Sequence, residues 1–110
     1  MLYFLFKMAE EKTKPILALS VTAQLLNLHP RTLMLYEKEG LIKPYRTSTN
    51  RRLFSQADLS QIQFIQYLID KKRANIAGAK VILDLLEKAK GRYPNLKEEF
   101  FPYFSQKELI

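Results

Sequence analysis

The chain has 110 residues and a formal net charge of +7, from eighteen Lys and Arg against eleven Asp and Glu. This length predicts one domain with a modest hydrophobic core, and a hydrophobic content of 47% argues against a disordered chain. There is no cysteine and only one histidine, which excludes disulfides, thiolate metal sites and thiol redox switches. The charge balance is compatible with nucleic acid, an anionic membrane surface or an acidic protein as partner.

The opening segment, MLYFLFK, is apolar but too short to span a membrane. It also lacks the basic start and the small-residue cleavage site of a signal peptide. Met8 is as natural a start as Met1, and the alternative is that residues 1–7 form a short strand packed on the domain. Residues 9–15 are charged and end at Pro15, so we expect residues 1–17 to be a flexible or mis-started lead.

Two short helices are predicted between residues 20 and 40. Ser20 is a good N-cap for the first helix, which residues 27–29 interrupt. Pro30 suits the first position of the second helix, and Gly40 suits its C′ position. Two such helices joined by a tight turn form a helix-turn-helix. In the first helix, the apolar residues at helical spacing are Val21, Leu25 and Leu28.

The segment 41–54 predicts a small β-hairpin, because the polar turn-forming residues 47–50 separate two short β-prone runs. Pro44 restricts the first of these strands to an edge of the sheet. Ser55 and Asp58 have the spacing of a capping box, which should open a third helix after the hairpin.

We expect this third helix to run to Lys72. Asn75 is a plausible cap for a fourth helix, which Gly91 ends. The predicted core positions are Leu59, Ile62, Phe64 or Ile65, and Leu68 or Ile69 in the third helix, and Ile76, Ala79 or Lys80, Leu83 and Leu86 in the fourth.

Residues 91–110 form a tail that we treat as separate from the domain at residues 18–90. Its aromatic cluster consists of Phe100, Phe101, Tyr103 and Phe104. The tail could close a dimer, dock a protein partner or pack back on its own domain, and the sequence leaves all three open.

The second helix has two faces. At 100° per residue, Leu33 and Tyr36 fall together and should face the first helix. The opposite side mixes charged and apolar residues, namely Arg31, Met34, Leu35 and Lys38. A solvated surface with two stray apolar residues would look the same.

The hairpin that follows favours a functional interpretation of this face. Between residues 30 and 54 there are six cations and two acids, a net +4, which is more than half of the excess charge of the chain. In a winged helix-turn-helix the second helix enters the major groove of DNA while the hairpin reaches the flanking phosphates or minor groove. The basic residues of the hairpin are Lys43, Arg46, Arg51 and Arg52.

The segment LSVTAQLLNLHPRTLMLYEKEGLIKPYRTSTNRRLFSQADLSQIQFI resembles the DNA-binding domain of the MerR superfamily. That family carries Thr-Leu-Arg-x-Tyr-Glu-x-x-Gly-Leu-(Leu/Ile)-x-Pro, then an Arg-x-(Tyr/Phe)-Ser/Thr wing and an Asp-Leu-x-x-(Leu/Ile) helix. The positions that match are Thr32, Leu33, Tyr36, Glu37, Gly40, Leu41, Ile42, Pro44, Arg52, Phe54, Ser55, Asp58, Leu59 and Ile62. The resemblance covers roughly residues 18–90 and implies a mainly α fold, a winged helix-turn-helix with a small β-hairpin wing and two further helices.

Three features look most like the heat-shock repressor subgroup, HspR. They are His29-Pro30 at the turn, the Asn50-x-Arg52-Leu53 wing and the segment at residues 75–78, Asn-Ile-Ala-Gly. This likeness implies a cytoplasmic, nucleoid-associated homodimer that binds an inverted-repeat operator in double-stranded DNA and represses heat-shock or chaperone genes. It also implies an Hsp70-type chaperone as co-repressor and no membrane partner.

Met34 is the main departure from the family pattern, which usually has Arg at this position. A methionine cannot pair with phosphate or form a bidentate bond to guanine, but it can pack against a thymine methyl. The expected DNA-binding residues are Arg31, Thr32, Met34, Leu35, Tyr36, Lys38, Lys43, Arg46, Arg51 and Arg52.

No catalytic residue, metal site or cofactor is expected. The acids form no catalytic pair, and three glycines cannot supply a phosphate-binding loop. His29 has no second His or Cys with which to hold a metal, so a cap or turn role is favoured. Two rival functions remain: an architectural or excisionase-like winged DNA-binding protein, and a protein-interaction adaptor that uses Met34 and Leu35.

Overall fold

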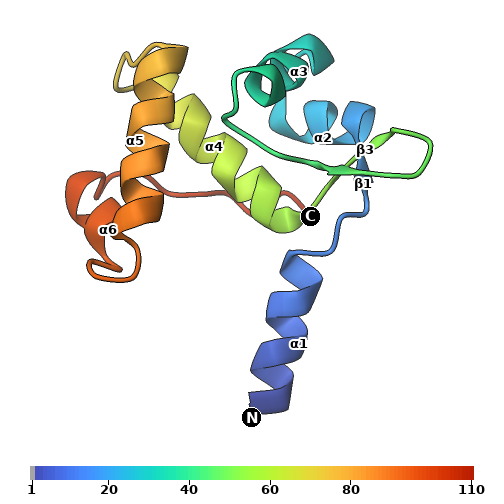
Figure 1. The fold of residues 1–110 in the computed structure, drawn as a ribbon, viewed down its shortest axis with the longest axis horizontal. Coiled ribbons are helices and arrows are strands. Elements are labelled where there is room, and N and C mark those ends of the chain that lie inside the picture. Colours follow the sequence, from blue (N-terminus) through green and yellow to red (C-terminus); the bar gives the residue numbers. More distant parts are fainter. Residues whose placement is uncertain (1) are drawn as a thin grey trace.

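The computed structural model describes residues 2–110, apart from the side chains of residues 6–9. Its elements in chain order are α1 (Leu2–Lys12), β1 (Leu17–Ala18), α2 (Leu19–Leu26), α3 (Pro30–Lys38), β2 (Tyr45–Arg46), β3 (Arg52–Phe54), α4 (Gln56–Asp70), α5 (Ile76–Ala89) and α6 (Leu96–Phe100). Helices α2 and α3 lie beside a small antiparallel sheet, and α4 connects them to α5 and α6 (Figure 1). The predicted mainly α, winged helix-turn-helix fold is confirmed.

Helix α2 begins at Leu19, so the prediction of Ser20 as its N-cap is wrong. Ala18 takes the cap position because β1 pairs with β3 and holds it in an extended conformation. The hydroxyl of Thr22 donates a 2.8 Å hydrogen bond to the carbonyl of Ala18, which satisfies this buried hydroxyl. Val21 is correspondingly rotated outward and 44% exposed, whereas Ala23 is buried.

Helix α3 begins and ends as predicted. Pro30 occupies its first turn, and the Nδ1 atom of His29 accepts a 3.0 Å hydrogen bond from the backbone N–H of Arg31. His29 is therefore the N-cap, the local role that the sequence favoured. Gly40 follows the helix with φ +78°, a left-handed conformation that favours glycine. Leu33 and Tyr36 are buried, as expected.

The sheet has the order β1-β3-β2, so β2, next to Pro44, is an edge strand as predicted. The hairpin strands are shorter than predicted, because Leu41 and Ile42 leave the strand direction and enter the core. The register places Arg46 of β2 opposite Arg52 of β3. Strand β1 was not predicted, since a two-residue strand is too short to produce a pattern.

Helix α4 is the centre of the core. The predicted capping box is present: Ser55 Oγ accepts from the Asp58 N–H at 3.1 Å, and Asp58 Oδ2 accepts from the Ser55 N–H at 2.9 Å. The helix ends at Asp70, two residues before the predicted end at Lys72. Its buried residues are Leu59, Ile62, Phe64, Ile65 and Leu68.

Helix α5 is capped by Asn75, whose Oδ1 accepts a 2.7 Å hydrogen bond from the N–H of Gly78. Of its predicted core positions only Ala79 is fully buried, and the others are partly buried against the core. Val81 and Leu85 are exposed on the other side of the helix.

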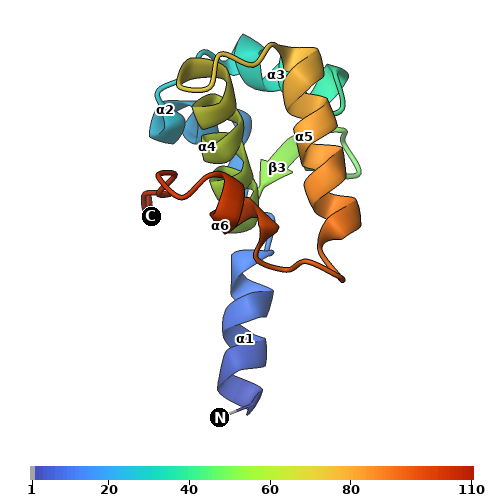
Figure 2. The same cartoon turned by 90° about the vertical axis from the view of Figure 1, so that its left-hand side faces the viewer.

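Residues 2–12 form helix α1, which projects away from the body of the protein (Figure 2). The alternative of a short strand in residues 1–7 is contradicted by residues 2–7, which are helical, and residues 9–12 continue the same helix. Leu2, Tyr3 and Phe4 are exposed on this helix. Met1 and the side chain of Met8 lie outside the described part of the chain, so the choice of start stays a prediction. Within the described residues no helix is long and apolar enough to span a membrane.

The aromatic tail packs back on its own domain. The rings of Phe101 and Phe104 lie 5.3 and 5.2 Å from that of Phe64, measured between centroids. The side-chain amide of Gln63 exchanges two hydrogen bonds with the backbone of Lys107, at 2.9 and 2.7 Å. Of the three roles left open for the tail, this is the one that the structure contains. Phe100 and Tyr103 remain exposed, so the dimer and partner roles stay predictions.

Candidate nucleic-acid interface

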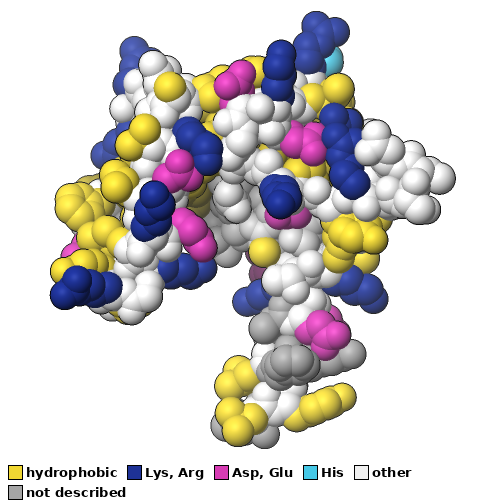
Figure 3. All heavy atoms as spheres, in the orientation of Figure 1, with side chains coloured by type: hydrophobic (Ala, Val, Ile, Leu, Met, Phe, Trp, Pro, Cys, Tyr) yellow, Lys and Arg dark blue, Asp and Glu magenta, His cyan; other side chains and the backbone are white. Residues whose placement is uncertain are grey.

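The outward face of α3 carries the mixed residues that the helical period predicted. Arg31 and Lys38 are exposed, and Met34 and Leu35 are 42% and 41% exposed. Thr32 is partly buried near the start of the helix. Figure 3 shows Lys and Arg side chains over α3 and the hairpin, on the upper right, and others spread over the side of the molecule formed by α5 and α6.

Tyr36 does not belong to this face. It is only 5% exposed because it shares the inner side of α3 with Leu33. Burial raises the pKa of its phenol above the ordinary 10.0, and the negative charge of Asp70 adds to this effect. Tyr36 is therefore a core residue in the free protein, and its predicted contact with DNA stays a prediction.

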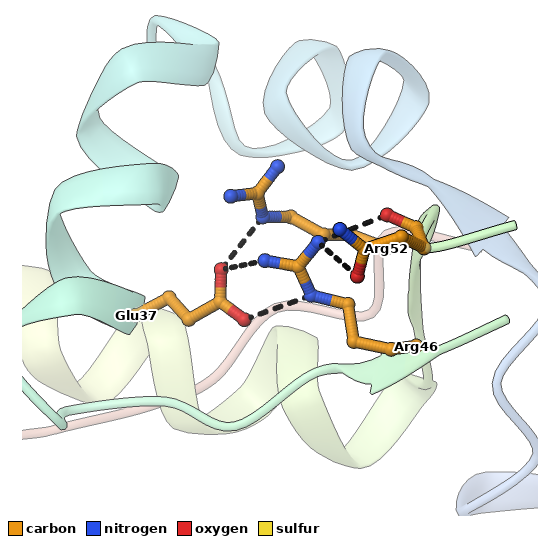
Figure 4. Close-up of polar contacts among 4 residues, drawn as sticks. Glu37, Arg46 and Arg52 are labelled. Atoms are coloured by element: carbon orange, nitrogen blue, oxygen red, sulfur yellow. Dashed lines mark hydrogen bonds and ion pairs between the residues drawn. The ribbon is translucent and has the colours of Figure 1, made fainter.

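One carboxylate joins α3 to both strands of the hairpin (Figure 4). Glu37 Oε1 accepts hydrogen bonds from Arg52 Nε at 2.6 Å and from Arg46 Nη2 at 3.0 Å, and its Oε2 accepts from Arg46 Nε at 3.2 Å. We call these three residues the Glu37 clamp. Charge-assisted, partly bidentate bonds of this kind fix geometry as well as adding energy.

The clamp is partly shielded from solvent, with 21% of the Glu37 side chain exposed. Burial by itself would raise the pKa of this carboxyl group. The hydrogen bonds and positive charges of Arg52 and Arg46 outweigh that effect and lower the pKa below its ordinary 4.5. The clamp therefore keeps Glu37 ionised and retains one net positive charge.

The four basic residues of the hairpin are not equivalent. Arg46 uses all its guanidinium nitrogens internally, because Nη1 also donates to the backbone oxygen of Asn50 at 3.0 Å. Arg52 donates through Nε alone among its described contacts, and its two terminal nitrogens point away from Glu37 (Figure 4). Lys43 and Arg51 are exposed, and neither side chain has an ion-pair partner among the described residues.

All ten predicted contact residues lie on α3 or in the wing segment, but they differ in accessibility, and Tyr36 is buried. The clamp itself was not predicted, since Glu37 was counted from the sequence only as an acid that reduces the local charge. The resemblance contained a signal for it, because Glu37 and Arg52 are both positions of the family pattern.

Among the described residues, no group of three or more His, Asp and Glu side chains could hold a metal ion. The chemistry on this face is that of cations, apolar side chains and hydrogen-bond donors. Such a surface can bind phosphates and the edges of bases.

Comparison with known proteins identifies the group to which the chain belongs. Residues 18–86 match the family described as MerR HTH family regulatory protein, and this match spans more than half of the chain. The chain is a member of the MerR family. The resemblance stated from the sequence is thereby confirmed.

Similar MerR-family proteins bear the names of transcriptional regulators or heat-shock proteins, not of enzymes. The chain is 39% identical over 71 residues to a Streptomyces coelicolor protein that bears the name heat shock protein HspR. That alignment covers 64% of this chain and 47% of the relative, so it spans about half of that protein. The chain is also 32% identical over 90 residues to the HTH-type transcriptional regulators GlnR of Bacillus anthracis and Bacillus cereus. Those alignments cover 82% of this chain and 68% of each relative.

The pKa of Glu37 leads to a prediction for stability. The pKa of Glu37 is lower in the folded protein than in the unfolded chain. The ionised carboxylate therefore stabilises the fold fully at a pH above its unfolded pKa, and this stabilisation is lost as the pH falls through its folded pKa. We expect Glu37→Gln to reduce the free energy of unfolding by about 1 kcal/mol at pH 7, and this deficit to shrink in acid. Urea denaturation from pH 7 to pH 3, with Glu39→Gln as control, measures it. A deficit that does not depend on pH would contradict the assignment.

Proposed function

We propose that this MerR-family protein is a sequence-specific DNA-binding repressor that acts as a homodimer on an inverted-repeat operator. The observation that carries the proposal is the outward face of α3 standing beside a basic wing to which the Glu37 clamp ties it. A helix and a wing held in one arrangement can contact a major groove and its flanking phosphates together.

The proposed DNA contacts fall into two groups: those of α3 would read the base sequence, and those of the wing would hold the protein on the DNA backbone. On α3, Arg31, Met34, Leu35 and Lys38 would face the bases and phosphates of the major groove, with Thr32 at the margin. On the wing, Lys43, Arg51 and the terminal nitrogens of Arg52 would meet the flanking backbone. Arg46, whose guanidinium nitrogens each donate inside the protein, would position the wing.

A heat-shock or chaperone operon is the proposed target. The likeness to the Streptomyces coelicolor protein named HspR supports this choice, as do the turn, wing and α5 motifs. An Hsp70-type chaperone is the proposed co-repressor, and the cytoplasm, at the nucleoid, is the proposed location. Exposed Val81 and Leu85 on α5 provide apolar surface that a second copy could bury.

The exposure of Met34 and Leu35 also favours a second candidate, a protein-interaction adaptor. In that case Arg31→Ala and Arg51→Ala would leave binding to the protein partner intact. The repressor requires Arg31→Ala to weaken operator binding by about 1–3 kcal/mol if it contacts a base edge.

The salt dependence of binding follows from the accessible cations. Arg31, Lys38, Lys43, Arg51 and Arg52 could neutralise about five phosphates per half-site, which predicts a slope near −4.5 per monomer for log affinity against log salt. Sites selected from random DNA and titrated by fluorescence anisotropy give this slope, and a two-fold repeat among them supports the dimer. A slope near zero would contradict DNA binding.

Met34 provides a test of the helix face. We expect Met34→Arg to strengthen operator binding by about 1–3 kcal/mol, or to shift the preferred base towards guanine, because arginine can form a bidentate pair with it. Tyr103→Arg adds the same charge on the exposed tail and should change neither property. If Met34→Arg behaves like this control, the face does not lie against the bases.

A further inference from the structure

The Glu37 clamp holds together two like charges that the sheet places side by side. Arg46 and Arg52 are direct cross-strand partners in the antiparallel pair β2–β3. Like charges in this arrangement destabilise a hairpin, and strands of two and three residues have little other pairing to offset it. The carboxylate of Glu37 lies within hydrogen-bond distance of both guanidinium groups and offsets their repulsion.

The same carboxylate determines what these arginines can do towards DNA. A free guanidinium binds any phosphate, whatever the base sequence, so unpaired arginines strengthen non-specific binding. Every guanidinium nitrogen of Arg46 already donates inside the protein, which leaves one N–H on Nη2 of this 34% exposed side chain. Arg52 donates through Nε alone among its described contacts, so both of its terminal nitrogens remain for a ligand. Of this arginine pair, Arg52 is therefore the main donor towards DNA, and its contact with Glu37 of α3 sets the direction of its terminal nitrogens.

We propose that Glu37 is a positioning residue for sequence discrimination: it withholds Arg46 from phosphates, aims Arg52 and fixes the wing relative to α3. This inference rests on the proposed function, and it assigns to an acidic residue a role in choosing among DNA sequences. A merely structural role for Glu37 would weaken binding to all DNA in parallel. The positioning role changes specific and non-specific binding in opposite directions.

The test compares Glu37→Gln with Glu39→Gln, which removes the same charge one residue beyond the end of α3. Glu39 forms no side-chain ion pair among the described residues. Affinities are measured for a selected operator and for an unrelated duplex across a range of salt concentrations.

For Glu37→Gln we expect tighter binding to the unrelated duplex and a slope steeper by about 0.9, because Arg46 is released and Arg52 is already counted among the accessible cations. The ratio of operator to non-specific affinity should fall about tenfold, a loss within the range of one misread base pair. Glu39→Gln should change both affinities by a similar factor and leave the ratio as it is.

Arg46→Gln provides a second readout that does not remove the carboxylate. Because Arg46 is engaged internally, its loss should leave the salt slope nearly unchanged while the affinity ratio falls. Arg51→Gln, at an exposed wing position, should make the slope about 0.9 less steep and hardly alter the ratio. If circular dichroism shows that Glu37→Gln does not fold, the Arg46→Gln and Arg51→Gln pair decides the question.

The outcomes separate this inference from the proposal beneath it. Parallel changes on both duplexes for Glu37→Gln, or a slope that Arg46→Gln reduces as much as Arg51→Gln does, would overturn the positioning role and leave DNA binding standing. A wild-type slope near zero would overturn the proposed function, and the inference would fall with it.

Discussion

The arrangement of this protein's proposed DNA-binding surface depends on one ionic contact, between the carboxylate of Glu37 and two guanidinium groups of the wing. The wing is a hairpin with very short strands, and hairpins of this size are not stable alone. Its attachment to β1 secures one side, and the Glu37 clamp secures the other side to α3. The contact also allows Arg46 and Arg52 to face each other across the sheet.

The clamp changes how the basic charge of the protein should be counted. The net +4 of residues 30–54 suggested a surface of equivalent cations, but the structure sorts them into engaged and accessible groups. Arg46 belongs to the first group and Arg51 to the second, with Arg52 between them. A basic patch is therefore not the same as a set of phosphate contacts, because an acid within the patch can select which cations remain available.

The elements that the sequence predicted well are those whose determinants are local. Pro30 and Gly40 bound α3 through their own backbone preferences, and the Ser55–Asp58 capping box opens α4 within a single turn. Helical periodicity separated buried Leu33 from exposed Met34 because α3 packs along one side only.

The features that the sequence could not supply depend on contacts between distant segments. Strand β1 exists because residues near 17 pair with residues near 54, and this pairing moved the start of α2 away from Ser20. The clamp joins residues nine and fifteen positions apart, and no local pattern predicts such pairs.

On this view the Glu37 clamp makes α3 and the wing one rigid unit before DNA binds. Backbone ¹⁵N order parameters of the free protein measure this directly, by comparing the wing amides at residues 47–51 with those of α3. We predict wing values close to the value of about 0.85 typical of rigid backbone, with a fall towards 0.6 in Glu37→Gln but not in Glu39→Gln. A wing that is already mobile in the wild-type protein, or one that Glu37→Gln leaves equally rigid, would contradict the claim.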